Sequence, residues 1–305
     1  MSSAEARAEA IKFSYVVIAE ENAKRIAVVD ATELCRGDSG VCDLVPLRSI
    51  ELSERPHNLT AIGAIVYATH PVAGTVSRID VATGDVLNVR VGTEPHDIKP
   101  AGEIGFLIVA DEKGRKLLKI DAETLVVMDT VEMPGEPHDM VVDGEILWVT
   151  LIGRSELVKV VDGNVELFAT GGSPHDLVVA RDGKIWFSNW GSDRLSIFDP
   201  ASGIVPDAPV GVGEPQHFAV DPVGSVWISD VAAGAVVGFV GKRPTVVQVG
   251  ASPHHVVFIG DTLVVAVSGT GETVFVEGGQ VVARARLSEG LHGLAIVELA
   301  GSLGG

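Results

Sequence analysis

Histidine recurs in one short phrase of the sequence, and histidine is both the commonest metal ligand and the usual general base near neutral pH. The phrase contains Pro-His in most of its copies and returns after 39, 42, 37, 41, 38 and 38 residues. Its seven central positions are His57, His96, His138, His175, Gln216, His254 and His292. Because only 9 of the 305 residues are His, six imidazoles at seven equivalent positions predict a shared role.

The same series of short apolar runs follows each copy of the phrase. The runs are rich in Val and Ile, five to eight residues long, and bounded by Gly, Asp and Pro, which is typical of strands. Four strands in a repeat of about 40 residues are typical of a propeller blade. The sequence therefore predicts an all-β, seven-bladed β-propeller with four-stranded blades.

The two ends of the chain together supply the seventh blade. Complete repeats begin near residues 57, 96, 138, 175, 216 and 254. Residues 14–53 contain three strand-like runs that correspond to the second, third and fourth strands of a blade, and residues 291–299 supply the missing first strand. Sharing one blade between the termini closes the ring and removes its open edges. We expect residues 1–305 to form a single domain.

The predicted propeller places the histidines around one channel. The first strand of each blade lies nearest the axis, so the seven positions of the phrase should surround the channel mouth. A second set of residues, 13 to 15 positions later, should end the second strands on the same face. These residues are Glu20, His70, Asp111, Leu151, Asn189, Asp230 and Ser268. The Asp residues that follow His in three repeats should face away by strand alternation and bond between blades.

Three interpretations of the imidazoles stay open: metal ligands, catalytic or substrate-binding groups without a metal, and architectural groups that bond neighbouring blades. A carboxylate behind an imidazole is typical of metal sites, and imidazole suits Zn, Cu, Fe or Ni, so a divalent metal ion is the expected cofactor. The candidate metal ligands are His57, His96, His292, His70 and Asp111. The candidate catalytic residues are His292, Glu20 and His254. A small-molecule or peptide ligand at the channel mouth would contact His138, His175, Gln216, Asn189, Trp190 and Asp230.

The repeated phrases resemble those of virginiamycin B lyase-like and YVTN-type propellers. The resemblance covers essentially the whole chain and is strongest in SPHDLVVARDGKIWFSNWGSDRLSIFD, residues 173–199. It implies opening of a cyclic peptide lactone with a divalent metal, usually magnesium, by His of the Pro-His phrase and Glu of a W-F-T-E phrase. The corresponding phrases here end in Asn189 and Asp230.

The resemblance leads to one main hypothesis and two alternatives. The main hypothesis is a metal-dependent lyase or hydrolase that acts on a small molecule or a cyclic peptide. The first alternative is a non-catalytic propeller that binds a ligand or a protein and whose histidine ring is architectural. The second is a His-ligated redox metal site, since propellers host many activities on one fold.

Composition excludes some classes of partner. The formal net charge of −18 argues against binding to nucleic acid, which needs basic patches, and to anionic membrane surfaces. No apolar run is long enough to span a bilayer, and the acidic N-terminal residues do not resemble a secretion signal, so we expect a cytoplasmic protein. Cys35 and Cys42 are either reduced thiols or a local bridge. Three Gln and five Asn are few, a weak indication of a thermophile. The oligomeric state is left open.

Overall fold

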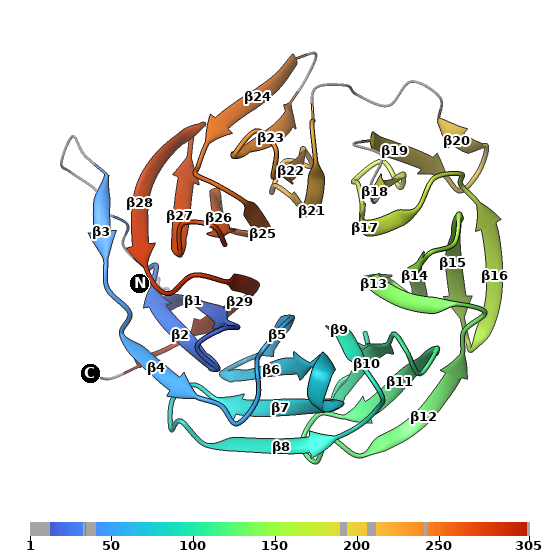
Figure 1. Cartoon of the computed structure of the whole chain (residues 1–305), viewed down its shortest axis with the longest axis horizontal. Coiled ribbons are helices and arrows are strands. Elements are labelled where there is room, and N and C mark those ends of the chain that lie inside the picture. The colour runs from blue at the N-terminus through green and yellow to red at the C-terminus, as the bar shows by residue number, and fades with distance from the viewer. Residues whose placement is uncertain are drawn as a thin grey trace, which may run out of the picture.

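The chain forms a ring of seven sheets around a central axis (Figure 1). The computed structural model describes residues 13–32, 34, 41–189, 194–205, 212–240 and 243–303. In each sheet the first strand lies nearest the axis and the fourth lies outermost (Figure 1). The predicted all-β, seven-bladed propeller is confirmed.

Each blade is an antiparallel meander of four strands. Each blade is given from the axis outwards. The first consists of β29 (Leu291–Leu299), β1 (Phe13–Glu20), β2 (Arg25–Asp30) and β4 (Arg48–Glu51), and the second of β5 (Leu59–Ile62), β6 (Ile65–His70), β7 (Thr75–Asp80) and β8 (Val86–Arg90). The third consists of β9 (Pro95–Pro100), β10 (Phe106–Asp111), β11 (Lys116–Asp121) and β12 (Val127–Glu132), and the fourth of β13 (Glu136–Asp143), β14 (Ile146–Ile152), β15 (Glu156–Val161) and β16 (Asn164–Ala169). The other three are β17 (Pro174–Val179), β18 (Ile185–Asn189), β19 (Arg194–Asp199) and β20 (Gly203–Val205); β21 (Pro215–Val220), β22 (Val226–Asp230), β23 (Ala235–Val240) and β24 (Arg243–Gln248); and β25 (Pro253–Ile259), β26 (Thr262–Val267), β27 (Glu272–Glu277) and β28 (Gln280–Arg286).

The two ends of the chain close the ring, as predicted from the sequence. Strand β29 pairs antiparallel with β1, in a register that places Tyr15 opposite Val297 and Val17 opposite Ala295. These four side chains belong to one buried apolar cluster, and they leave at most 5% of their surface exposed. Closure therefore rests on both a strand ladder and a packed core.

A short strand of the N-terminal segment adds an unpredicted connection between blades. Strand β3 (Cys42–Leu44) pairs in parallel with β28, on the outer edge of the neighbouring blade (Figure 1). It covers backbone groups that an edge strand would otherwise leave unpaired. Cys42 is disulfide-bonded, and Cys35 lies outside the described residues.

Aromatic residues join neighbouring blades. The ring of Trp148, on β14, lies 6.1 Å from that of Phe198 of the next blade. The rings of Trp186 and Phe239 are 5.3 Å apart in the same arrangement. These tryptophans occupy equivalent second-strand positions, where they pack between blades. Among the described residues, no helix is long and apolar enough to cross a membrane.

A β-bulge recurs on the strands that line the channel. In β17, for example, Pro174 is opposite Asn189 and Leu177 is opposite Phe187, so that two residues of β17 face one residue of β18. Equivalent irregularities occur in β9, β13, β21, β25 and β29. In five of these six strands the bulge lies directly after the Pro of the repeated phrase. Because a bulge redirects side chains, two consecutive residues can face the channel here.

Candidate functional site

The imidazoles of the repeated phrase lie side by side around the channel. His57 Nε2 and His96 Nε2 are 2.9 Å apart, and the rings of His57 and His292 are stacked with centroids 3.6 Å apart. The ring centroids of His96 and His138 are 4.0 Å apart, and those of His138 and His175 are 4.1 Å apart. We call the seven positions of the phrase the first ring: His57, His96, His138, His175, Gln216, His254 and His292.

The residues that follow the first-ring positions form a second polar set, which we call the second ring: Asn58, Asp97, Asp139, Asp176, His217 and His255. The stacked rings of His217 and His255 have centroids 3.5 Å apart, and the ring of His255 lies 4.5 Å from that of His292. Eight of the nine histidines are therefore gathered at the channel. The sequence analysis missed His217 and His255, although the adjacent pairs Gln-His and His-His at a bulge could have indicated them.

The aspartates of the second ring differ among themselves. Asp97 accepts a hydrogen bond from the Met140 amide of the next blade, and Asp139 accepts one from the amide of Leu177. These two contacts agree with the predicted role between blades. Asp176 instead lies among the imidazoles: its carboxylate is 2.8 Å from His175 Nδ1 and 3.4 Å from His217 Nδ1. Strand alternation failed to predict this orientation because the bulge interrupts the alternation.

Two glutamates lie behind first-ring imidazoles. Glu112 Oε2 is 2.9 Å from His138 Nδ1, and both residues are buried. Glu21 Oε1 is 3.9 Å from His57 Nδ1. Each glutamate directly follows a residue that was predicted to face the ring, Asp111 or Glu20, so that expectation was one position out of register. The paired acids Glu20-Glu21 and Asp111-Glu112 were the available signal.

The predicted strand-end residues hold the loops that lead into the first strands, and we call them the anchors. Asp111 accepts hydrogen bonds from the amides of Thr93, at 2.9 Å, and Glu94, at 2.6 Å. Asp230 accepts hydrogen bonds from the amides of Gly213 and Glu214. Each bond fixes the loop just before the first strand of the anchor's own blade. Both carboxylates are thus bonded to backbone amides. The sequence had suggested Asp111 as a metal ligand and Asp230 as a ligand-binding residue.

The other anchors follow the same rule. Buried Glu20 is 2.7 Å from Arg25 Nε and accepts a hydrogen bond from the Ser288 amide before β29. Burial alone would raise the pKa of Glu20, but the hydrogen bonds from Arg25 and Ser288 outweigh burial and hold it below its usual value. His70 Nδ1 lies 2.9 Å from the Arg55 carbonyl, and His70 Nε2 lies 2.7 Å from Ser77 Oγ.

The remaining candidates lie on the less polar side of the same end. Asn189 donates a hydrogen bond to Ser196 Oγ at 2.8 Å, and a Cβ at Gly172 would lie 2.3 Å from its Oδ1. Leu151 is buried in an apolar cluster, and Ser268 lines the central cavity. Trp190 lies outside the described residues. The structure thus brings His57, His96 and His292 together as predicted, but directs His70, Asp111 and Glu20 to the loops.

Burial lowers the pKa values of several imidazoles at the channel. Burial lowers the pKa of His96 to about 3 and that of His254 to about 4. Burial, reinforced by neighbouring imidazoles, also lowers the pKa values of His57, His255 and His292 well below their usual values. A neutral imidazole is the form that binds metal ions and accepts protons.

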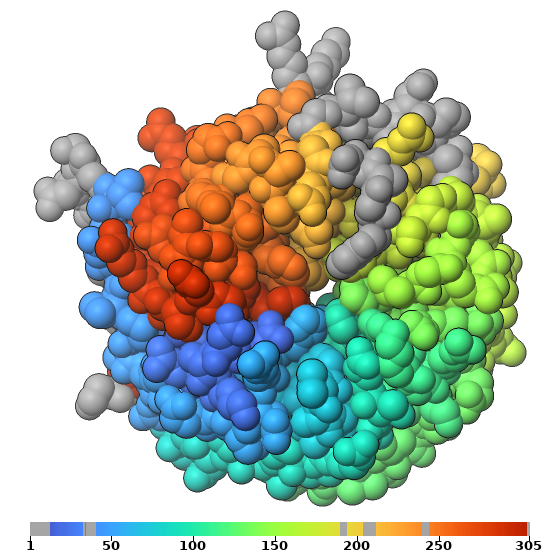
Figure 2. Space-filling view, in the orientation of Figure 1, coloured from blue at the N-terminus to red at the C-terminus, as the bar shows by residue number. Residues whose placement is uncertain are grey.

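Two cavities open at the first ring. The central cavity, about 400 Å³, is lined by all six first-ring imidazoles and by Gln216 and Glu214, among others. A second cavity of about 470 Å³ also touches His57 and His96, and extends towards Lys24, Arg55 and Glu54. A narrow opening is visible at the centre of the space-filling view (Figure 2). The imidazoles are therefore accessible to an ion and to a small molecule.

Comparisons with known proteins agree with this fold. No family model matches the sequence. Over 118 residues the chain is 30% identical to virginiamycin B lyase of Nocardia farcinica (strain IFM 10152), a match that covers 36% of this chain and 40% of that protein. The crystal structure of virginiamycin B lyase from Staphylococcus aureus superposes with a TM-score of 0.68 at 14% identity, covering 78% of this chain and 87% of that one.

The chain therefore shares the propeller fold of virginiamycin B lyase. A functionally unknown protein from Desulfotomaculum acetoxidans is similar over more of the chain, with a TM-score of 0.71 at 15% identity, covering 93% of this chain and 98% of that one. The resemblance inferred from the repeated phrases is confirmed at this level. Since propellers of one fold host many activities, the function has to be argued from the ring itself.

Proposed function

We propose that the protein binds a transition-metal ion such as Zn²⁺ through first-ring imidazoles, with His57, His96 and His138 as ligands. The observation that carries this proposal is the orientation of these rings. His96 Nδ1 lies 3.3 Å from the His138 carbonyl oxygen, and His138 Nδ1 lies 2.9 Å from Glu112. When an acceptor holds one ring nitrogen, the other nitrogen is directed elsewhere with a lone pair, which is the usual preparation of a metal-binding histidine.

The Nε2 atoms of His57 and His96 converge, and His138 lies beside His96. His57 Nε2 and His96 Nε2 point at each other over 2.9 Å, and ligand atoms of His96, Glu112 and His138 lie within 4.8 Å of one another. Two neutral imidazoles this close can share one proton or bind one cation between them. Burial lowers the pKa values of His57 and His96, so protons compete weakly with a metal for these two residues at neutral pH.

The donor set does not fit magnesium, the ion that the family resemblance implies. Magnesium prefers six oxygen ligands and keeps several waters, whereas this ring offers imidazole nitrogens. Of the two positions that correspond to the Glu of the resemblance, one is Asn189 and the other is Asp230, which is bonded to backbone amides. Imidazole ligands suit Zn, Cu, Ni, Co or Fe, and we derive no step through magnesium.

The architectural interpretation explains the ring less well. Blade-to-blade bonds beside the channel are made mainly by other groups. Thr69 Oγ1 donates to the His96 carbonyl at 2.7 Å, and Thr150 Oγ1 donates to the His175 carbonyl at 2.6 Å. Gly293 N donates to the His57 carbonyl at 2.9 Å, and a Cβ at Gly293 would lie 2.5 Å from that oxygen. The backbone of the histidines thus holds the blades, which leaves the imidazoles for another role.

Metal binding to untagged protein tests the proposal. Chelator-treated protein is titrated with Zn²⁺, and bound metal is counted by elemental analysis after gel filtration. We expect wild type to retain Zn²⁺, and His96→Ala and His138→Ala to lose the ion held by these residues. Glu112→Gln should weaken binding about 10- to 100-fold, because the carboxylate orients His138. His70→Gln removes an imidazole from an anchor and should bind as wild type does. Unchanged binding by both alanine variants would refute the assignment.

A metal-dependent lyase or hydrolase is the second candidate, and the cavity beside His57 favours it. That cavity adjoins the proposed ligands and offers Lys24 and Arg55 as cationic groups for a polar substrate. A neutral, buried imidazole is suited to accept a proton from such a substrate. The test incubates Zn²⁺-loaded protein with virginiamycin B, the substrate that the relative's name states, and follows ring opening by chromatography and mass spectrometry. Unchanged cyclic substrate would remove this candidate without affecting the metal proposal.

A further inference from the structure

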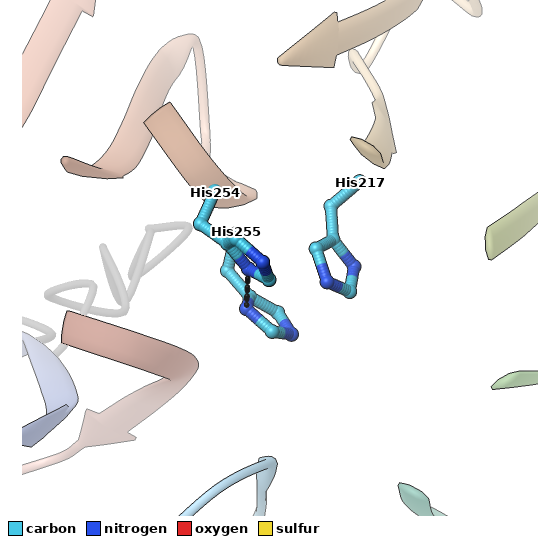
Figure 3. Close-up of side chains that lie close together, drawn as sticks. All are labelled: His217, His254 and His255. Carbon is cyan, nitrogen blue, oxygen red and sulfur yellow. Dashed lines mark hydrogen bonds between the residues drawn. The ribbon is translucent and has the colours of Figure 1, made fainter. Parts of the chain in front are cut away.

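The side of the channel opposite β9 and β13 carries a separate group of histidines. His217 lies on β21, and His254 and His255 lie on β25 (Figure 3). One ligand nitrogen from each of the three lies within 4.8 Å of the other two. His254 Nδ1 and His255 Nδ1 are 3.2 Å apart, and the ring of His217 lies 4.9 Å from that of His254. None of the three belongs to the group of His57, His96 and His138.

We infer that His217, His254 and His255 form a second transition-metal site, distinct from the one proposed above. Three neutral imidazoles are a known ligand set for zinc, with one coordination position left open. The bulge after Pro253 makes this set possible, because it brings two consecutive histidines of one strand to the channel. Strand β21 has the same kind of bulge, which contains Gln216 and His217. Because its first-ring position is Gln216, this strand contributes the imidazole of His217, a second-ring residue.

The second site also has a carboxylate behind it. Asp176 Oδ1 lies 3.4 Å from His217 Nδ1, and Asp176 is 1% exposed. This arrangement repeats the contact of Glu112 with His138 on the other side of the channel. A carboxylate that contacts one ring nitrogen of His217 fixes the orientation of that imidazole.

The two sites should differ in their chemistry. The site at His217, His254 and His255 has only imidazoles among its closest ligand atoms, whereas Glu112 lies among the ligand atoms of the other site. An all-imidazole set adds no negative charge, so it should favour softer or borderline ions over hard ones more strongly than a set with a carboxylate. We therefore expect the tri-imidazole site to bind Zn²⁺ or Co²⁺ and to ignore Mg²⁺ and Ca²⁺.

Stoichiometry separates the two sites. Untagged, chelator-treated protein is loaded with Zn²⁺, freed of excess metal by gel filtration and analysed for zinc per chain. We expect two zinc ions per chain in wild type. A variant of one site, either His255→Ala or His217→Gln, or else His96→Ala or His138→Ala, should retain one ion. A double variant that combines one substitution from each site should retain none. His70→Gln is the matched control and should retain two. Thermal unfolding followed by circular dichroism confirms that each variant is folded before it is scored.

The visible spectrum of bound Co²⁺ gives a second readout at this site. Co²⁺ in a tri-imidazole site of low coordination number absorbs in the visible, and His217→Gln should remove that component while His96→Ala leaves it in place. If wild type binds one ion that only the His96 and His138 variants lose, the second site is refuted and the proposed function stands. If only the His217 and His255 variants lose it, the second site stands and the first assignment fails. Zinc-free wild type would refute both.

Discussion

Two sets of polar residues occupy the same end of this propeller, and they differ in what the backbone near them offers. The anchors Asp111 and Asp230 accept hydrogen bonds from backbone amides of the loops that lead into the first strands. The first-ring histidines follow those loops, and their carbonyls are already bonded to neighbouring blades. Imidazole occurs in both sets, because His70 is an anchor, so residue type alone does not separate a site from a structural support. The backbone donors near each side chain separate the two sets.

Removing β29 should break both sets at once and is the largest effect that we expect. Deletion of residues 291–305 removes His292 from the ring and exposes the ladder edge of β1, which pairs with β29 over seven residues. We expect loss of cooperative thermal unfolding in calorimetry. Deletion of residues 304–305 alone is the control and should preserve the transition. A truncated chain that still unfolds cooperatively near the wild-type temperature would contradict the role of β29 in closure.

The ring imidazoles and the anchors should change the free energy of unfolding in different pH ranges. The pKa values of His96 and His254 in the folded protein are about 3 and about 4, below the usual 6.5. Below pH 6.5 the unfolded chain binds protons that the folded chain does not, so the free energy of unfolding of metal-free protein decreases as pH falls from 6.5 towards these values. Each group should contribute about 1–2 kcal/mol of this loss by pH 5.

The anchor Glu20 should affect stability only at lower pH. Its pKa is lowered in the folded protein, so its contribution is present above 4.5 and is lost only as pH falls further. Urea unfolding of chelator-treated protein at pH 7.5, 6.5, 5.5 and 4.5 checks the difference. The double variant His96→Gln/His254→Gln should show a shallower decrease between 6.5 and 4.5. Equal slopes for the variant and wild type would show that these imidazoles are not the groups that titrate.

Loss of one anchor should cost more stability than loss of one ring imidazole. Asp230→Ala leaves the amides of Gly213, Glu214 and Ala233 without their acceptor, and we expect a decrease of about 2–3 kcal/mol in the free energy of unfolding. His57→Ala in metal-free protein should cost about 1 kcal/mol, since its main polar contact is another imidazole. Urea unfolding at pH 7.5 with chelator measures both. A larger loss for His57→Ala would reverse the comparison.

The smallest effect should come from Glu21. Its carboxylate is 3.9 Å from His57 Nδ1 and about one third exposed, so Glu21→Gln should change the free energy of unfolding by no more than about 0.5 kcal/mol. Glu112→Gln, at a buried contact of 2.9 Å, should cost more. The same unfolding experiment ranks the two variants. Equal costs would mean that burial does not separate these two glutamates.

The repeat predicted the fold because each blade is encoded locally. Spacing, strand chemistry and the leftover runs at both ends were enough to place β29 beside β1, and the first-ring histidines followed from their position in the blade. The sequence could not show the bulges, because they depend on how many residues of one strand face its partner. This is why His217, His255 and Asp176 were missed as channel residues. The parallel pairing of β3 with β28 could not be predicted either, since it joins residues 241 positions apart.

The recurring bulge has a consequence for how such a ring can change. Five inner strands each carry two neighbouring side chains at a bulge, which makes ten positions that precede the regular hydrogen-bonded ladder. In the sixth bulge, in β29, Gly293 leaves no room for a side chain, because a Cβ there would lie 2.5 Å from the His57 carbonyl oxygen. The same scaffold could carry carboxylates, amides or aromatic groups at the ten positions, as Asp176 and Gln216 already illustrate. A combinatorial library restricted to these ten positions would sample different receptors on one unchanged frame.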